Sequence, residues 1–181
     1  TVVGISLFDS ENQICSLEYI KFKEKTTLFE RLDDFIKYMD TLSSALGLEN
    51  SEHKIEHISI EEPLKKFKGR FSNADTIQKL TFMNAMISGY LYRKFGTVPR
   101  YYNVNTARKT AFPDLKIPQS APNKKYIIWE NVVEREPQIN WKYSKRTHKL
   151  MKENFDMSDA YVCGLCDIIT REKTQKNISK D

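Results

Sequence analysis

Short runs rich in β-forming residues alternate along this chain with long segments of helical periodicity, and this order restricts the folds open to it. Residues 2–8 and 14–22 are apolar runs separated by a turn cluster at 9–12, which predicts a β-hairpin. Further β-forming runs predict strands at 55–60 and 98–104. Apolar residues at helical spacing predict helices at 28–46, 74–95, 124–135 and 156–171. Strands interleaved with helices favour an α/β fold, in which a mixed sheet is flanked by helices.

The clearest single helix is the one expected at 28–46. It opens on Thr27 and Glu30, a capping-box pattern in which each side chain bonds the backbone N–H of the other residue. Apolar residues then recur at helical spacing and predict one buried face, made of Leu28, Leu32, Phe35, Met39, Leu42 and Leu46.

Length and composition indicate one soluble globular domain, residues 1–181, with a polar tail at 172–181. No apolar run approaches the roughly 18 residues of a membrane span, so we expect no membrane partner. The formal net charge is +5, from 29 Lys and Arg against 24 Asp and Glu. The basic residues cluster at 65–70, 108–109, 124–125 and 142–146, and aromatic residues lie among them. This pattern suits a polyanion such as nucleic acid, although any one cluster is more often a solvated face.

The three cysteines favour a reducing, intracellular compartment, because an odd number without a secretory signal does not suit a disulfide framework. The cytoplasm of a bacterial or virus-infected cell would fit. Cys163 and Cys166 form a C-x-x-C pair, which can be a redox pair or half of a zinc site. They lie inside an apolar helical stretch with no second pair, so we expect buried, inert thiols.

Two acids stand at the start of the last expected helix, where a polar segment becomes apolar. Asp156 and Asp159 are three residues apart, so on a helix they share a face and could together hold a hard divalent cation. The alternative is a capping arrangement, with Asp156 as the N-cap and Asp159 as the acid of the first turn. The spacing alone favours the cap.

A second pair of acids, Glu61 and Glu62, follows the strand expected at 55–60, just before Pro63. The carboxyl ends of strands are where ligands gather in open α/β sheets. Neighbouring strand residues point to opposite faces, so only one of the two can join a site. The alternation of Ile58 and Ile60 leaves that choice open.

These motifs together resemble the RuvC-like branch of the RNase H-like nucleases, the Holliday-junction resolvases, and in particular their phage or viral members. The resemblance covers roughly residues 1–171 and rests on the order of weak motifs. These are an apolar strand ending in Glu61, a helix opening on Asn-Ala-Asp at 73–75 with Lys-Leu at 79–80, and Asp156 followed by Asp159-Ala160. Lysines before the last helix also fit the family.

The resemblance implies a metal-dependent endonuclease that cuts four-way or other branched DNA as a two-fold homodimer. Glu61, Asp156 and Asp159 would bind two Mg²⁺ or Mn²⁺ ions and no small-molecule cofactor, with Lys125 as a further catalytic residue; the family pattern also selects Glu61 over Glu62. The residues expected to contact nucleic acid are Lys65, Lys66, Phe67, Lys68, Arg70, Arg108, Lys109, Lys124 and Lys145.

The chain departs from the family pattern at one point. The family's first strand carries a catalytic Asp, whereas the runs at 2–8 and 14–22 match the second and third strands, so the first strand and its acid are expected upstream of the sequence. If 2–8 were itself the first strand, Ser6 or Asp9 would have to replace that acid, and Ser6 would mean a disabled site. In either case the chain as given should be a poor catalyst. The competing hypothesis is a module that binds branched nucleic acid without cutting it.

Overall fold

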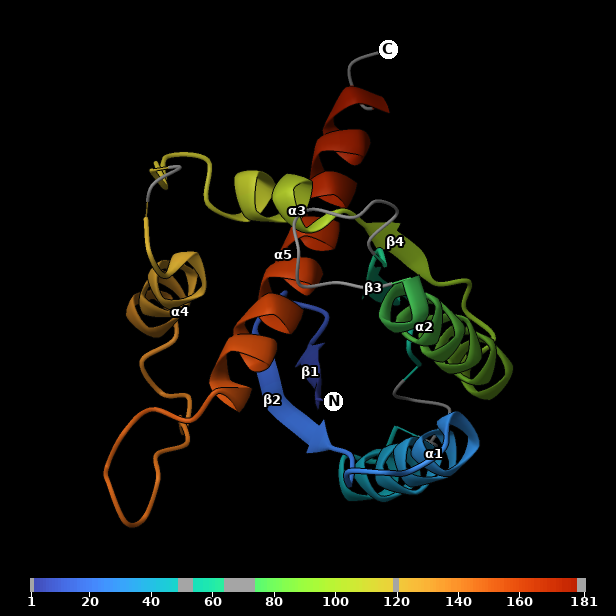
Figure 1. The fold of residues 1–181 in the computed structure, drawn as a ribbon. Coiled ribbons are helices and arrows are strands. Elements are labelled where there is room, and N and C mark those ends of the chain that lie inside the picture. Colours follow the sequence, from blue (N-terminus) through green and yellow to red (C-terminus); the bar gives the residue numbers. More distant parts are fainter. Residues whose placement is uncertain (1, 49–53, 64–73, 119–120, 179–181) are drawn as a thin grey trace. The chain divides into compact units, whose positions relative to one another are not determined.

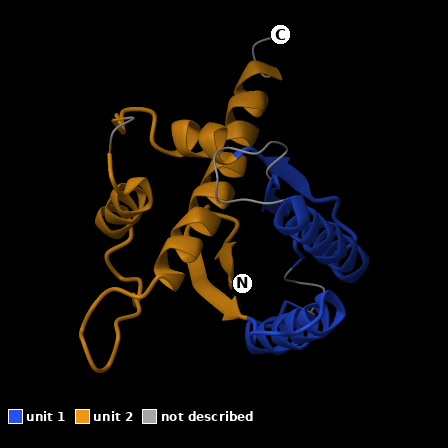
Figure 2. Cartoon of the chain, in the orientation of Figure 1, with its two compact units in different colours: residues 1, 22–103 blue, residues 2–21, 104–181 orange. Residues whose placement is uncertain are grey.

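The computed structural model describes residues 2–48, 54–63, 74–118 and 121–178. These residues form two compact units, shown in different colours in Figure 2. Unit 1 comprises residues 22–103, and unit 2 comprises residues 2–21 and 104–181. The architecture is mixed α/β, with helices and small sheets, and each unit is described by itself.

Unit 2 begins with the expected hairpin, strands β1 (Val2–Phe8) and β2 (Ile14–Lys21), which pair antiparallel. The register runs from Val2 opposite Lys21 to Phe8 opposite Ile14, with an irregularity between Leu7 and Phe8. The turn is built around Asp9, whose carboxylate accepts the backbone N–H groups of Glu11 and Gln13 at 2.9 and 2.8 Å. A carboxylate that satisfies two turn amides explains why the chain reverses here.

Three helices complete unit 2: α3 (Val104–Ala111), α4 (Lys124–Arg135) and α5 (Glu153–Ile178). The long red helix in Figure 1, α5, packs against β1, β2, α3 and α4. Its middle is buried almost without interruption from residue 157 to 168, and the C-x-x-C cysteines lie there at 6% and 1% exposure. This confirms the expected burial of both thiols.

The contact between β1 and α5 is unusually close. A Cβ atom on Gly4 would overlap the backbone carbonyl of Asp156, and one on Gly164 would lie 2.5 Å from the ring of Phe8. Between these two points, the hydroxyl of Ser6 donates to the carbonyl oxygen of Ala160 at 3.0 Å. Every second residue of the strand therefore contacts every fourth residue of the helix. The two spacings match because two strand residues span about 6.6 Å along the strand, and four helix residues span about 6 Å along the helix axis.

The start of α5 is also attached to the end of β2. The Lys21 ammonium contacts the carboxylate of Glu153 at 2.7 Å, and Glu153 is buried although it is the first residue of the helix. The hydrogen bond from Lys21 holds the pKa of Glu153 below its usual value. This ion pair joins the first residue of α5 to the last residue of β2.

Unit 1 contains helices α1 (Leu28–Ala45) and α2 (Ala74–Phe95) and the short parallel strands β3 (Ser59–Glu61) and β4 (Arg100–Tyr102). The capping box at the start of α1 is confirmed: the Thr27 hydroxyl accepts the N–H of Glu30, and the Glu30 carboxylate accepts the N–H of Thr27. Because β3 and β4 are parallel, α2 lies in the crossover that joins them.

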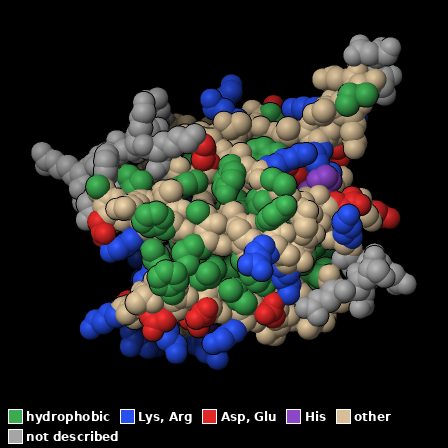
Figure 3. Space-filling view, turned by 90° about the vertical axis from the view of Figure 1, so that its right-hand side faces the viewer, with side chains coloured by type: hydrophobic (Ala, Val, Ile, Leu, Met, Phe, Trp, Pro, Cys, Tyr) green, Lys and Arg blue, Asp and Glu red, His purple; other side chains and the backbone are tan. Residues whose placement is uncertain are grey.

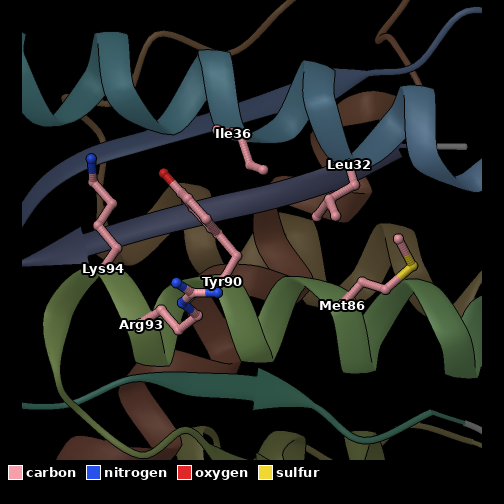
Figure 4. A pocket seen from close by; sticks show the side chains of 6 residues that line it. All are labelled: Leu32, Ile36, Met86, Tyr90, Arg93 and Lys94. Carbon is pink, nitrogen blue, oxygen red and sulfur yellow. The ribbon is translucent and has the colours of Figure 1, made fainter.

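Helices α1 and α2 lie side by side; polar side chains join them, and an apolar groove is lined by both helices. Asp40 on α1 accepts hydrogen bonds from Tyr90 and Lys94 on α2 at 2.9 and 2.6 Å. Burial of the Tyr90 hydroxyl and, as a smaller cause, its hydrogen bond to Asp40 raise the pKa of Tyr90 to about 12. Beside this cluster lies a groove of about 450 Å³, lined by Leu32, Ile36, Met86, Tyr90, Arg93 and Lys94 (Figure 4). Figure 3 views the molecule from the side of α1 and α2, where apolar side chains gather among charged ones.

The sequence placed several boundaries incorrectly. α5 begins at Glu153 rather than 156, so Asp156 lies inside the first turn and is not the N-cap. The expected polar tail is helical up to Ile178, because Glu, Lys and Gln are good helix formers even when exposed. The helix α3 was missed because it is short, although Ala107 and Ala111, both buried, have helical spacing.

The strands of unit 1 are shorter than expected. The strand predicted at 55–60 is reduced to 59–61, and the one at 98–104 to 100–102. Pro99 has no N–H to extend this ladder beyond Arg100. The described strands form two ladders of two strands each, β1–β2 and β3–β4, and the single mixed sheet stays a prediction. None of the described helices is long and apolar enough to span a lipid bilayer.

Replacing Gly164 by alanine tests the close packing of α5 on β1. A methyl group there meets the Phe8 ring, so Gly164→Ala should lower the free energy of unfolding, and Gly4→Ala should lower it further, by about 1 to 3 kcal/mol. The matched helical control is Gly89→Ala in α2, where a Cβ meets nothing within 4 Å; alanine should stabilise it by up to about 1 kcal/mol. Urea unfolding followed by circular dichroism measures all three. A stabilised Gly164→Ala would contradict the packing.

Candidate functional site

The structure brings together four of the residues singled out from the sequence, all in unit 2. Asp156 and Asp159 project from the first two turns of α5, Lys125 from the first turn of α4, and Arg108 from α3. Lys125 reaches both carboxylates, which confirms that the two acids share a face of the helix. We call these four residues the acid-pair cluster.

Arg108 is the tightly held cation of the cluster. Its guanidinium donates to Asp159 at 2.7 Å, and the two side chains are 18% and 12% exposed. Such a buried charge-assisted bond fixes the orientation of the carboxylate. The Nε of Arg108 is buried and has no hydrogen-bond partner among the described residues. The sequence predicted Arg108 to be a phosphate contact, and the structure places its guanidinium on Asp159.

Lys125 is the loosely held cation. Its ammonium lies 3.3 Å from Asp159 and 3.7 Å from Asp156, and half of its side chain is exposed. Because half of the Lys125 side chain is exposed, solvent screens both pairs, and the longer pair with the partly exposed Asp156 contributes little to stability. The ammonium can therefore leave the carboxylates at low energetic cost.

Asp156 lies in an environment that disfavours its charge. Burial raises the pKa of Asp156, Lys125 opposes the shift, and the neighbouring charge of Asp159 adds to it. The pKa of Asp156 is therefore higher in the folded than in the unfolded protein. As the pH rises from the unfolded-state pKa to the folded-state pKa, the free energy of unfolding falls, because Asp156 must ionise in a place that disfavours its charge. A bound cation would relieve that cost.

Strand β1 packs against the backbone of α5 at the turns that carry the acid pair. The absence of a side chain at Gly4 lets the strand approach the backbone at Asp156, and Ser6 bonds Ala160, the residue after Asp159. The β1 residue that faces this turn of α5 is therefore a hydroxyl and not a carboxylate. Both assignments of residues 2–8, as the first or as the second strand of the family pattern, stay predictions, as does a preceding strand with its own acid.

The donor set of unit 2 suits one divalent cation. Two carboxylates on one helical face can hold a Mg²⁺ or Mn²⁺ ion whose remaining ligands are water and substrate phosphate. Among the residues that the structure describes, no group of three or more His, Cys, Asp or Glu side chains could hold a metal. Among the described residues, no third carboxylate therefore joins Asp156 and Asp159, and a second ion stays a prediction.

The candidate acids of unit 1 lie at the end of β3. Glu61 is the last residue of the strand, its side chain is exposed, and its backbone carbonyl accepts the Asn84 amide at 2.8 Å. Glu62 is half-buried. The choice between the two stays a prediction.

The remaining predicted contacts to nucleic acid are spread over several segments. Lys109 on α3, Lys124 at the start of α4 and Lys145 before α5 are all exposed. Five further residues, Lys65, Lys66, Phe67, Lys68 and Arg70, lie outside the described residues. No local pattern could predict the pairing of Arg108 with Asp159, because the two residues lie 51 positions apart.

Comparison with solved structures relates the chain to a known fold. The structure of RuvC from Thermus thermophilus matches with a TM-score of 0.56 over 96% of this chain and 89% of RuvC, at 10% sequence identity. The chain has a RuvC-like fold. No protein-family model matches the sequence, and no curated protein matches it at a significant level. At 10% identity the likeness to RuvC concerns the fold, and it carries no assignment to the phage or viral members.

The two ion pairs of the cluster should differ in strength. A double-mutant cycle of Arg108→Ala and Asp159→Ala should give a coupling of about 1 to 3 kcal/mol, because both groups are largely buried. The cycle of Lys125→Ala and Asp156→Ala should give less than about 1 kcal/mol, because Lys125 is half exposed. Urea unfolding without divalent metal measures both. Equal couplings, or a larger one for Lys125, would contradict the division into a fixed and a loose cation.

Proposed function

We propose that this chain is a metal-dependent, structure-selective endonuclease that cuts four-way (Holliday) or other branched DNA. The observation that carries the proposal is the acid-pair cluster at the start of α5, on a chain with a RuvC-like fold. Paired carboxylates with a lysine and an arginine beside them are the groups that phosphodiester hydrolysis uses to hold a cation and a phosphate.

In this proposal Asp156 and Asp159 hold a Mg²⁺ or Mn²⁺ ion, which when bound activates water and stabilises charge on the phosphate. Arg108 keeps the Asp159 carboxylate in place through its 2.7 Å bond. Lys125 is the residue that moves. Its ammonium neutralises the acids without the ion, and once displaced it is free to contact a phosphate oxygen of the DNA.

The other predicted residues complete the proposed site. Glu61 would supply the carboxylate needed for a second ion, and Lys109 and Lys124 would contact the DNA backbone. Such phosphate contacts position a duplex without reading its sequence. A homodimer would present two such sites to the two symmetric strands of a junction.

A second candidate function is binding of branched DNA without cleavage. The observation that favours it is Ser6: the β1 residue that bonds the backbone of α5 just after the acid pair carries a hydroxyl, which adds no carboxylate to Asp156 and Asp159. With two acids neutralised by two cations, the cluster is close to charge balance and attracts a divalent ion less than three acids would.

Cleavage of a labelled four-way junction in Mg²⁺ or Mn²⁺ distinguishes the two functions. If the protein is a nuclease, the full-length wild type cuts, and Glu61→Gln and Asp159→Asn each lower the rate by at least about a hundredfold, as expected for metal ligands. The matched control is Glu130→Gln, an exposed acid on α4 with no ion pair in the described part of the chain. It should cut normally.

Two outcomes would contradict the nuclease. If both variants cut like the wild type, the assigned acids are wrong. If the full-length wild type binds the junction but cuts nothing in either metal, the binding module is correct.

A further inference from the structure

The segment that leads into α5 contains a strongly basic loop, residues 142–152. It holds five of the 29 Lys and Arg residues of the chain and none of the 24 Asp and Glu. The rest of the chain therefore has 24 basic and 24 acidic residues, so the loop accounts for the whole net charge of +5. In Figure 1 this orange loop projects away from α4 and from the start of α5.

The loop has a defined backbone conformation. Tyr143 and Leu150 form an antiparallel bridge, and Met151 donates its N–H to the carbonyl of Lys142 at 3.1 Å. At the tip, Ser144 and Lys149 are joined by a backbone hydrogen bond of 2.9 Å. This ladder holds the chain in a narrow hairpin-like shape.

A buried amide anchors the loop to α5. The Asn154 side chain is fully buried, and its oxygen accepts the N–H of Lys142 at 3.0 Å. Its amino group donates to the carbonyl of the same residue at 2.7 Å. A buried amide that pairs both groups of one backbone residue fixes the base of the loop relative to the helix that carries Asp156.

The cations of the loop tip differ from those of the acid-pair cluster. Lys145, Arg146 and Lys149 are exposed, and none of them has a carboxylate partner in the described part of the chain. Arg108 and Lys125, by contrast, are already paired with aspartates. Three unpaired cations held close together repel each other and are stabilised by an anion with repeated charges.

We propose that this basic loop binds the phosphate backbone of a nucleic acid duplex. Repeated phosphates match repeated unpaired cations, and the binding would be independent of sequence. A membrane surface fits less well, because the tip residues 144–149 include no Phe, Tyr, Trp, Leu, Ile, Val or Met side chain to insert between lipids. Only the choice of a DNA junction as the probe rests on the proposed function.

The test compares two triple variants that lose the same charge. The first is Lys145→Ala, Arg146→Ala and Lys149→Ala; the control is Lys23→Ala, Lys37→Ala and Lys173→Ala, three exposed lysines elsewhere. Binding to a fluorescent four-way junction and to a linear duplex is measured against NaCl concentration. Each phosphate contact contributes a slope of about −0.9, so the loop variant should bind at least tenfold more weakly, with a salt slope reduced in magnitude by about 2 to 3. The control should keep the slope of the wild type.

Several results would overturn the proposal: an unchanged salt slope in the loop variant, equal losses in both variants, or no DNA binding by the wild type. Loss of binding to phosphatidylserine vesicles with intact DNA binding would instead assign the loop to a membrane. Both variants should unfold at the wild-type temperature, since the side chains removed are exposed. A wild type that binds DNA through the loop but never cuts would refute the nuclease and leave the loop proposal standing.

Discussion

The contact between β1 and α5 is the interaction on which unit 2 depends. A long, largely buried helix lies directly on a strand because Gly4 and Gly164 remove the two side chains that would keep them apart. Ser6 bonds the helix backbone between these two points. The first two turns of α5 are therefore held by the backbone of β1 on one side and by the Lys21–Glu153 ion pair near β2 on another. The orientation of Asp156 and Asp159 follows from this packing.

Charge balance governs what these acids can do. Two carboxylates in a half-buried place need counter-charges, and the chain supplies them from α3 and α4. The cations are unequal: the guanidinium of Arg108 is buried and close, whereas the ammonium of Lys125 is exposed and distant enough to leave. An acid pair with one fixed and one replaceable counter-ion can exchange an internal ammonium for a divalent cation without losing its geometry. The basic loop adds unpaired positive charge next to the same helix, fixed there by Asn154.

Local patterns allowed much of the fold to be predicted, and the errors occur where long-range contacts decide. The hairpin, the capping box of α1 and the ranges of α2 and α4 are all encoded by residues a few positions apart, and the structure confirms them. The start of α5 was misplaced, and the buried first residue Glu153 is paired there with Lys21, 132 residues away, a contact that no local pattern shows. Likewise, the spacing of Asp156 and Asp159 identified them as a candidate pair. Their partner Arg108 could not be identified in this way, because it lies on α3, a helix that the sequence did not predict. The role of Ser6 became visible only once β1 was found against α5.

The most direct test of the account is a crystal structure of the protein grown with Mn²⁺, in which anomalous scattering locates the metal. We predict a manganese peak between the carboxylates of Asp156 and Asp159, with Arg108 still bound to Asp159 and the Lys125 ammonium displaced from both acids. A structure with Lys125 still bridging the two aspartates and manganese elsewhere, or not bound, would contradict the central claim that this pair is a metal site with a replaceable internal counter-ion.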